Sequence, residues 1–335
     1  MRKNLLQNST RDSSIDILRC LALTGIILVH SKPALFWAQL RSFDVPLMVL
    51  LSAVCFNMNV GGHFSYSSYL KKRFVRLVMP SWIFLTCYFI GNYALTKHIS
   101  ISKMIACYTL TTSWYFWIIR ILFGMAIIAP FLKMLSDKMT IRNLLLICIL
   151  MFGATELLAL LSSVYFYKLA IMFIPYAAIY QLGMNVKRFS GSSILKSGLL
   201  LLMVYIAIAV ILYVFNGAYL PTGKFKYPPR IYYVTYALGA SALLWYYRQG
   251  ITKMLQIMYL HKFAQFVGSH TFWIYLWHIP FVDYMVNQYD SPTTFVTVYF
   301  IAIVITYLQT TIVNKICDHV SRPTLRKNLQ MIFIG

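Results

Sequence analysis

SIDILRCLALTGIILVHS, residues 14–31, is an apolar stretch of 18 residues in which Asp16, Arg19 and His30 are the acidic and basic side chains. A helix that crosses the hydrocarbon core of a bilayer needs roughly 20 mostly apolar residues, so this stretch predicts a first membrane-spanning helix. The same pattern recurs along the chain and predicts nine further spans, at residues 45–60, 80–96, 114–132, 143–164, 169–186, 197–215, 231–247, 263–286 and 293–314.

The composition of the whole chain supports a membrane protein. Apolar residues make up 60% of the 335 residues and charged residues 11%, whereas a typical soluble domain has about 45–50% and about 25%. No loop between the predicted spans is long enough for a separate soluble domain. We therefore expect residues 1–335 to form one all-α integral membrane domain, a polytopic bundle of about ten transmembrane helices.

The distribution of basic residues predicts the orientation of the bundle. An even number of spans places both termini on one side, and in that arrangement 20 Lys and Arg residues fall on the side of the termini and 8 on the opposite side. Basic residues accumulate in cytoplasmic loops, so both termini are expected in the cytoplasm. This bias also accounts for the formal net charge of +22, and a nucleic-acid partner is not expected. Membrane lipids are the expected surroundings.

The six cysteines are scattered, and most lie inside apolar stretches. They form no CxxC pair and no Cys/His spacing of the kind that binds zinc. The sequence therefore predicts neither a metal site nor a disulfide framework.

Acidic and basic residues inside a span are costly to bury and are candidates for function. Arg19 and His30 are eleven residues apart, which is close to three helical turns, so they share a helix face at an axial separation of about 16 Å. Arg19 would lie near the cytoplasmic end of the span and His30 near the outer end. The simpler interpretation pairs Arg19 with Asp16 and leaves His30 as an interfacial residue.

Arg73 and Arg76 also share a helix face, on the cytoplasmic approach to the span that is expected to begin at Pro80, because proline suits the first turn of a helix. Two arginines in this arrangement form a cradle that can bind phosphate with two hydrogen bonds each. The alternative is ordinary enrichment of basic residues beside a span.

Four further residues fall in the outer half of the bundle. Trp114 opens an aromatic segment typical of the membrane interface, and Arg120 follows about 9 Å deeper. Glu156 lies at a comparable depth, so the simplest expectation is an Arg120–Glu156 ion pair. His278 precedes Pro280, which is expected to kink its helix.

These residues fall into two groups, one at the cytoplasmic end of the predicted bundle and one in its outer half. The three arginines at the cytoplasmic end, Arg19, Arg73 and Arg76, could bind an anionic cosubstrate. In the outer half, a histidine could deprotonate a hydroxyl group or carry an acyl group transiently. The catalytic candidates are therefore His30, Glu156 and His278, and the substrate-binding candidates are Trp114 and Arg120.

The chain resembles the membrane-bound acyltransferase family 3, which includes O-acetyltransferases of bacterial surface polysaccharides. The resemblance rests on motifs in four places: Arg19 to His30 as Arg-x10-His, Arg73-Phe-Val-Arg76 before Pro80, Ser113-Trp114-Tyr115-Phe116, and Ser269 to Pro280 with Tyr275-Leu276-Trp277-His278. One departure stands at residues 45–53, which keep Ser52 but lack the aromatic pair and the glycine that are frequent there in the family.

The resemblance implies acetyl-CoA as the donor, the arginines near its phosphates and His30 as the catalytic group. It also implies a multi-pass protein of the bacterial cytoplasmic membrane and, as acceptor, a hydroxyl group of a cell-envelope glycan or of a lipid-linked precursor. A transporter or flippase for a lipid-linked sugar is the alternative, in which the arginines would bind pyrophosphate. That alternative predicts no dependence on acetyl-CoA.

Overall fold

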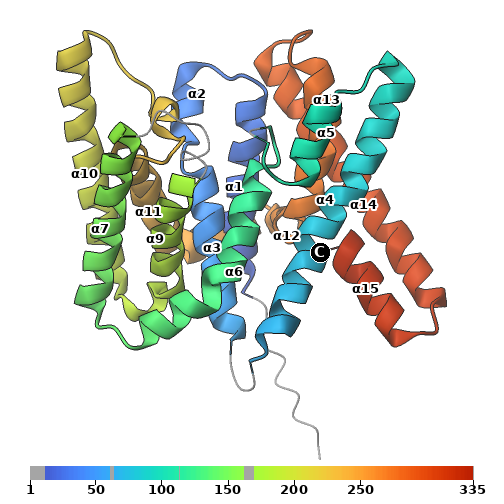
Figure 1. The fold of residues 1–335 in the computed structure, drawn as a ribbon, viewed down its shortest axis with the longest axis horizontal. Helices are drawn as coiled ribbons and strands as arrows, with labels where there is room; N and C mark the ends of the chain where they lie inside the picture. The colour runs from blue at the N-terminus through green and yellow to red at the C-terminus, as the bar shows by residue number, and fades with distance from the viewer. Residues whose placement is uncertain (1–11, 61–63, 113, 162–169, 335) are drawn as a thin grey trace, which may run out of the picture.

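The computed structural model describes residues 12–60, 64–112, 114–161 and 170–334, and these residues form helices and loops without a β-strand. Most of the longer helices run between the upper and lower ends of the bundle in Figure 1. The α-helices are α1 (Ser13–His30), α2 (Leu35–Leu40), α3 (Asp44–Asn59), α4 (Tyr66–Thr96), α5 (Ile101–Tyr108), α6 (Trp117–Asp137), α7 (Ile141–Leu161), α9 (Phe173–Met184), α10 (Gly191–Asn216), α11 (Ile231–Ile257), α12 (His261–Ser269), α13 (Thr271–Met285), α14 (Ser291–His319) and α15 (Pro323–Phe333).

The all-α membrane fold is confirmed. Within the described ranges, seven helical stretches are long and apolar enough to cross a membrane: α1, Leu35–Asn59, α4, α6, α7, α10 and α14. The other three predicted spans correspond to α9, to α11 and to the pair α12–α13. The number of crossings and the cytoplasmic termini remain predictions. Ser113, the end of the predicted span 143–164 and the start of the span 169–186 lie outside the described residues.

Local sequence explains both ends of α1. Asp12 caps its start, because its carboxylate accepts a hydrogen bond of 3.0 Å from the backbone N–H of Ser14. The helix ends at His30, and Lys32 then adopts a left-handed conformation (φ 52°) directly before Pro33. A left-handed residue followed by proline cannot continue a helix. His30 therefore occupies the last position of α1.

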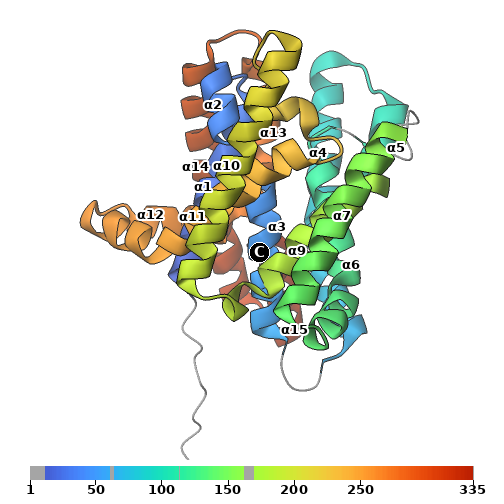
Figure 2. The ribbon, with the colours of Figure 1, turned by 90° about the vertical axis from the view of Figure 1, so that its left-hand side faces the viewer.

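Helix α10, at the left edge of the bundle in Figure 1 and nearest the viewer in Figure 2, has an exposed apolar surface. It spans 26 residues, yet Gly198 is its one buried residue. Its exposed side chains are large and apolar, including Leu199, Leu200, Met203 and Ile206. In water such a surface would be a severe aggregation hazard, so the apolar face of α10 is a lipid-facing surface.

The interior is centred on α1, α3 and α13, whose apolar side chains belong to one continuous core. Close backbone approach tightens this core at Gly268, where a Cβ atom would stand 1.7 Å from the carbonyl oxygen of Asp16. Any larger residue would push α12 away from α1. This close contact also fixes the first turns of α1, which contain Asp16 and its ion-pair partner Arg19.

The expectation that a helix begins at Pro80 is wrong. Helix α4 begins at Tyr66, capped by Ser65, and continues through Pro80 to Thr96. The segment from Tyr66 to Arg76 is rich in polar residues and therefore has the composition of a loop, but it forms the first turns of a helix of 31 residues. Arg73 and Arg76 consequently lie on a rigid helix.

The predicted span 263–286 is interrupted at His270, which separates α12 from α13. The carbonyl oxygen of Phe266 accepts a hydrogen bond from Ser269 Oγ (2.9 Å) and lies 2.8 Å from His270 Nδ1. Side chains that bond to the backbone in this way compete with the helical pattern. A further helix that the sequence pattern did not predict, α15, follows α14 and packs against α4 and α14 (Figure 1).

Candidate active site

His30 and His278 meet in the structure, although 248 residues separate them in the chain. The His30 Nδ1 atom lies 2.9 Å from the His278 Nε2 atom, and the two rings stack with their centroids 5.0 Å apart. His278 is completely buried, whereas His30 is partly exposed. His30 is therefore the histidine that a substrate can reach, and His278 stands behind it.

The hydrogen bonds of this histidine pair fix which nitrogen atom is available for chemistry. His278 Nδ1 bonds to the carbonyl oxygen of Tyr275, and a carbonyl can only accept, so Nδ1 carries the proton. In a neutral His278 the Nε2 atom is then an acceptor, and His30 Nδ1 must donate to it. The neutral His30 ring consequently keeps an unprotonated Nε2 atom, which is the lone pair that a general base needs.

Tyr115 supports the pair from the side. Its ring meets the His30 ring edge-on at a centroid distance of 4.6 Å, and it contacts the His278 ring in the same manner at 5.6 Å. The Tyr115 hydroxyl donates to Asp283 Oδ1 (2.8 Å), and Tyr88 donates to Asp283 Oδ2 (2.9 Å). This network ties the segment before α6 to α4 and α13, and it holds the rings rigidly.

Replacing His278 with phenylalanine is expected to lower kcat about 10- to 100-fold, because an outer partner that sets a histidine tautomer is typically worth this much activity. The Michaelis constant for the donor should stay near the parental value. His278→Gln should recover part of the loss, since its amide oxygen can accept the hydrogen bond that His30 Nδ1 donates. Steady-state kinetics of the purified variants measures both constants. Equal activity of His278→Phe and the parent would show that His278 is a packing residue.

Glu156 and Arg120 do not form the ion pair that the sequence suggested. Glu156 instead binds Arg230, with the Arg230 Nε atom 2.7 Å from its carboxylate, and it also accepts the backbone N–H of Ile231. Ile231 is the first residue of α11, so the carboxylate of Glu156 caps that helix. Arg120 donates to the carbonyl oxygens of Leu110 (2.8 Å) and Thr112 (3.3 Å). The expected pair fails because each residue has a closer partner in its own neighbourhood.

The two substrate-binding candidates flank the segment before α6. Arg120 stabilises the turn that precedes this segment. The ring of Trp114 packs against Tyr88 and Tyr115, at centroid distances of 5.3 and 5.0 Å, and the Lys103 ammonium lies 4.0 Å from its centroid. Trp114 therefore contacts the tyrosines that surround Asp283 and the histidine pair, whereas Glu156 belongs to the interface between α7 and α11.

Sequence reasoning missed a buried charge cluster formed by Arg41, Asp44 and Lys226. Arg41 donates to Asp44 Oδ2 (2.6 Å), and the Lys226 ammonium lies 4.0 Å from Asp44 Oδ1. All three side chains are buried. Burial lowers the pKa of Lys226 to about 8, an effect that Asp44 opposes. The i, i+3 spacing of Arg41 and Asp44 was the available signal, but the loop that brings Lys226 to them has no such pattern.

Arg73 and Arg76 line a pocket of about 800 Å³. Its lining residues come mainly from the end of α3, the first turns of α4 and α15, which lie in the lower part of the bundle in Figure 1. Helices α3, α4 and α15 form its walls. Its basic side chains are Lys72, Arg73, Arg76 and Lys327, and no carboxylate lies among its described lining residues. A concave site with this charge attracts anions, and the volume is within the usual range of roughly 300–1,000 Å³ for a ligand pocket.

Arg19 is not among the lining residues of this basic pocket. It binds Asp16 at 3.3 Å, as the simpler interpretation of the sequence expected, and it donates to Cys55 Sγ at 3.1 Å. Cys55 directly precedes Phe56, which lines the pocket. Arg19 thus joins α1 to the pocket wall.

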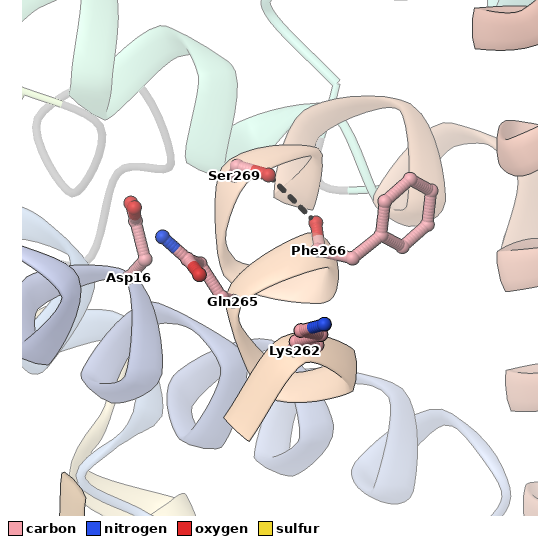
Figure 3. Close-up of a pocket in the computed structure, with 5 residues that line it drawn as sticks. All are labelled: Asp16, Lys262, Gln265, Phe266 and Ser269. Atoms are coloured by element: carbon pink, nitrogen blue, oxygen red, sulfur yellow. Dashed lines mark hydrogen bonds between the residues drawn. The ribbon is translucent and has the colours of Figure 1, made fainter. Parts of the chain in front are cut away.

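A smaller pocket of about 270 Å³ is lined by Asp16 of α1 and by residues of α12 (Figure 3). The Gln265 side chain points toward Asp16 in Figure 3, and Ser269 donates to the carbonyl oxygen of Phe266. Lys262 supplies one positive charge and Asp16 one negative charge. The smaller pocket therefore lacks the excess positive charge of the larger pocket.

The structure thus holds a histidine pair at the end of α1 and a pocket lined by basic residues of α4 and α15. Residues 12–314 match the model of the family described as acyltransferase domain, and the chain belongs to this acyltransferase 3 family. No curated protein and no solved structure matches the chain. Among the described residues, no group of His, Cys, Asp and Glu is placed to hold a metal ion.

Proposed function

We propose that this acyltransferase moves an acetyl group from acetyl-CoA, bound from the cytoplasm, to a hydroxyl group of a cell-envelope glycan or of its lipid-linked precursor in the bacterial cytoplasmic membrane. The observation that carries this proposal is the histidine pair, in which His278 holds the partly exposed His30 with its Nε2 atom unprotonated. A base of this kind suits an acceptor hydroxyl, whose proton must leave as the oxygen reacts.

The reaction can be written from the residues present. His30 Nε2 takes the proton of the acceptor hydroxyl while the hydroxyl oxygen forms a bond to the thioester carbonyl carbon. The tetrahedral intermediate then breaks its C–S bond, which leaves the acetyl ester on the acceptor. CoA departs as a thiolate and receives the proton from His30. His278 stabilises the imidazolium that forms in between through its Nε2 acceptor.

The positions of the two sites favour an elongated donor. His30 lies at the upper end of α1 in Figure 1, and the basic pocket lies at the lower end of the bundle. Arg19, beside the pocket wall, is about 16 Å from His30 along the axis of α1. Acyl-CoA has its phosphates at one end and its thioester at the other, so one donor molecule can engage both sites.

The acetyl content of the surface glycan tests the proposal. Mass spectrometry should detect acetyl esters in cells that carry the protein and a loss of those esters in cells that lack it. Purified protein in vesicles should also consume acetyl-CoA when the glycan acceptor is present. An unchanged acetyl content would contradict the proposal. Movement of a lipid-linked sugar without acetyl-CoA would favour the flippase alternative.

Labelling of single cysteines tests the orientation that a cytoplasmic donor requires. In a background with the exposed native Cys87 replaced by alanine, Lys224→Cys in η2 (Thr222–Phe225) should react with a membrane-impermeant maleimide in intact spheroplasts. Ser192→Cys, at the start of α10, should react only after permeabilisation. Both positions are exposed, so burial does not limit the reaction. The opposite pattern would place the basic pocket outside the cell and exclude a cytoplasmic donor.

A further inference from the structure

Helix α15 contributes to the basic pocket although it lies beyond the residues that match the acyltransferase family. Three of its residues line the pocket: Lys327, Gln330 and Met331. They share the lining with Lys72, Arg73 and Arg76 of α4, against which α15 packs (Figure 1). One wall of the basic pocket is therefore made by α15.

The end of α15 is firmly attached to the bundle. The Phe333 ring stacks on the Trp273 ring at a centroid distance of 5.9 Å, and Trp273 Nε1 donates to the carbonyl oxygen of Ile332 (2.8 Å). Gln309 Nε2 donates to the carbonyl oxygen of Phe333 (2.7 Å). These contacts come from α13 and α14, so α15 is held in one position relative to the pocket.

The charges on α15 are divided between the pocket and its outer side. Arg326 forms an ion pair with Asp318 of α14 at 3.1 Å and is not among the lining residues. Its neighbour Lys327 lies in the lining, and no ion pair of Lys327 occurs within the described part of the chain. The positive charge of Lys327 thus adds to that of the α4 residues rather than being neutralised by an acid.

We infer that Lys327 is a phosphate-binding residue of the donor pocket and that α15 forms a donor-binding wall of the pocket that Arg73 and Arg76 also line. The inference rests on the proposed function, because the phosphates in question are those of acyl-CoA. A lysine ammonium interacts with phosphate as a point charge with three donors, whereas the arginines provide planar, bidentate contacts. The phosphates would then be bound from two sides of the pocket.

An anionic lipid headgroup has the same phosphate chemistry as the CoA nucleotide, and basic pockets between membrane helices can bind such headgroups. The Ser and Asn side chains of the pocket, and its volume of about 800 Å³, favour a bulky polar ligand over a single headgroup. A lipid remains a measurable alternative outcome.

The test compares charge reversal at Lys327 of α15 and at Arg322, the residue that precedes this helix. Lys327→Glu should weaken the affinity for acetyl-CoA about 10-fold. This is the lower end of the range expected for the loss of a charge-assisted hydrogen bond, because Lys327 is exposed to water. Arg322→Glu, the matched control, makes the same charge change at the exposed residue that precedes α15, outside the pocket, and should bind acetyl-CoA like the parent. Isothermal titration calorimetry in nanodiscs of phosphatidylcholine measures both affinities, and a thermal unfolding scan shows that both variants are folded.

Equal acetyl-CoA affinities of the folded Lys327→Glu variant and the parent would overturn the inference. If Lys327→Glu instead lost only the stabilisation that phosphatidylglycerol gives to the parent, the wall would serve a lipid headgroup, and the inference would be wrong. A parent protein that does not bind acetyl-CoA at all would contradict the donor named in the proposed function. The three results are distinguishable because the first compares the acetyl-CoA affinities of the variant and the parent, the second compares their stabilisation by phosphatidylglycerol, and the third concerns the parent alone.

Discussion

Cells whose protein carries His30→Asn or His30→Gln should add acetyl groups to their glycan about 10²- to 10⁴-fold more slowly than cells with the parent, which is the usual effect of removing a general base. Both side chains are polar, but neither has a nitrogen that can take up a proton near neutral pH. His30→Ala should be similarly inactive. The time course of acetyl incorporation, followed by mass spectrometry, measures the loss.

Binding of the donor separates catalysis from folding in these variants. The basic pocket lies at the other end of the bundle from His30, so acetyl-CoA should bind to His30→Asn with the parental affinity. His319→Asn is a suitable control, because His319 is exposed and contacts the carbonyl oxygen of Lys315 in the last turn of α14. It should acetylate normally. Near-parental acetylation by His30→Asn or His30→Gln would remove the catalytic role from His30, and His278 would become the next candidate.

The sequence predicted the membrane class and most helices because both depend on the local density of apolar residues. The first span, expected at 14–31, is found at Ser13–His30. The errors occur where helices contain many polar residues. The start of α4 and most of α15 lie in the lower part of the bundle in Figure 1, and many of their polar side chains are exposed, so neither segment forms the continuous apolar stretch that predicts a span.

The partners of the charged residues could not be predicted from depth alone. The sequence predicted a similar depth in the membrane for Arg120 and Glu156. In the structure, Glu156 instead forms an ion pair with Arg230 across the interface between α7 and α11. By contrast, the Asp16–Arg19 pair was predictable because its three-residue spacing fixes a contact within one helix. The contact between His30 and His278 depends on how α1 packs against α13, and no local pattern encodes that.

Removal of both Arg73 and Arg76 should have an effect as large as that of the His30 variants, but on the affinity for the donor instead of on the rate. A charge-assisted contact to phosphate is worth about 1.5–3 kcal/mol, so each single variant, Arg73→Ala or Arg76→Ala, should raise the apparent Michaelis constant for acetyl-CoA roughly 10- to 100-fold. The double variant should raise it roughly 10²- to 10⁴-fold if the two contacts are independent. Titration calorimetry with acetyl-CoA measures the corresponding loss of affinity.

The structure makes the arginine prediction specific, because Lys71 lies on the same helix but outside the lining of the pocket, and Arg142 is an exposed residue of α7. The double variant Lys71→Ala with Arg142→Ala removes the same total charge and should bind acetyl-CoA like the parent. Arg73→Lys and Arg76→Lys should recover only part of the affinity, since lysine lacks the planar fork of the guanidinium group. The rate at saturating donor should stay near the parental value in every arginine variant, because the pocket lies far from His30. Parental affinity of a normally inserted double variant would show that the phosphates bind elsewhere.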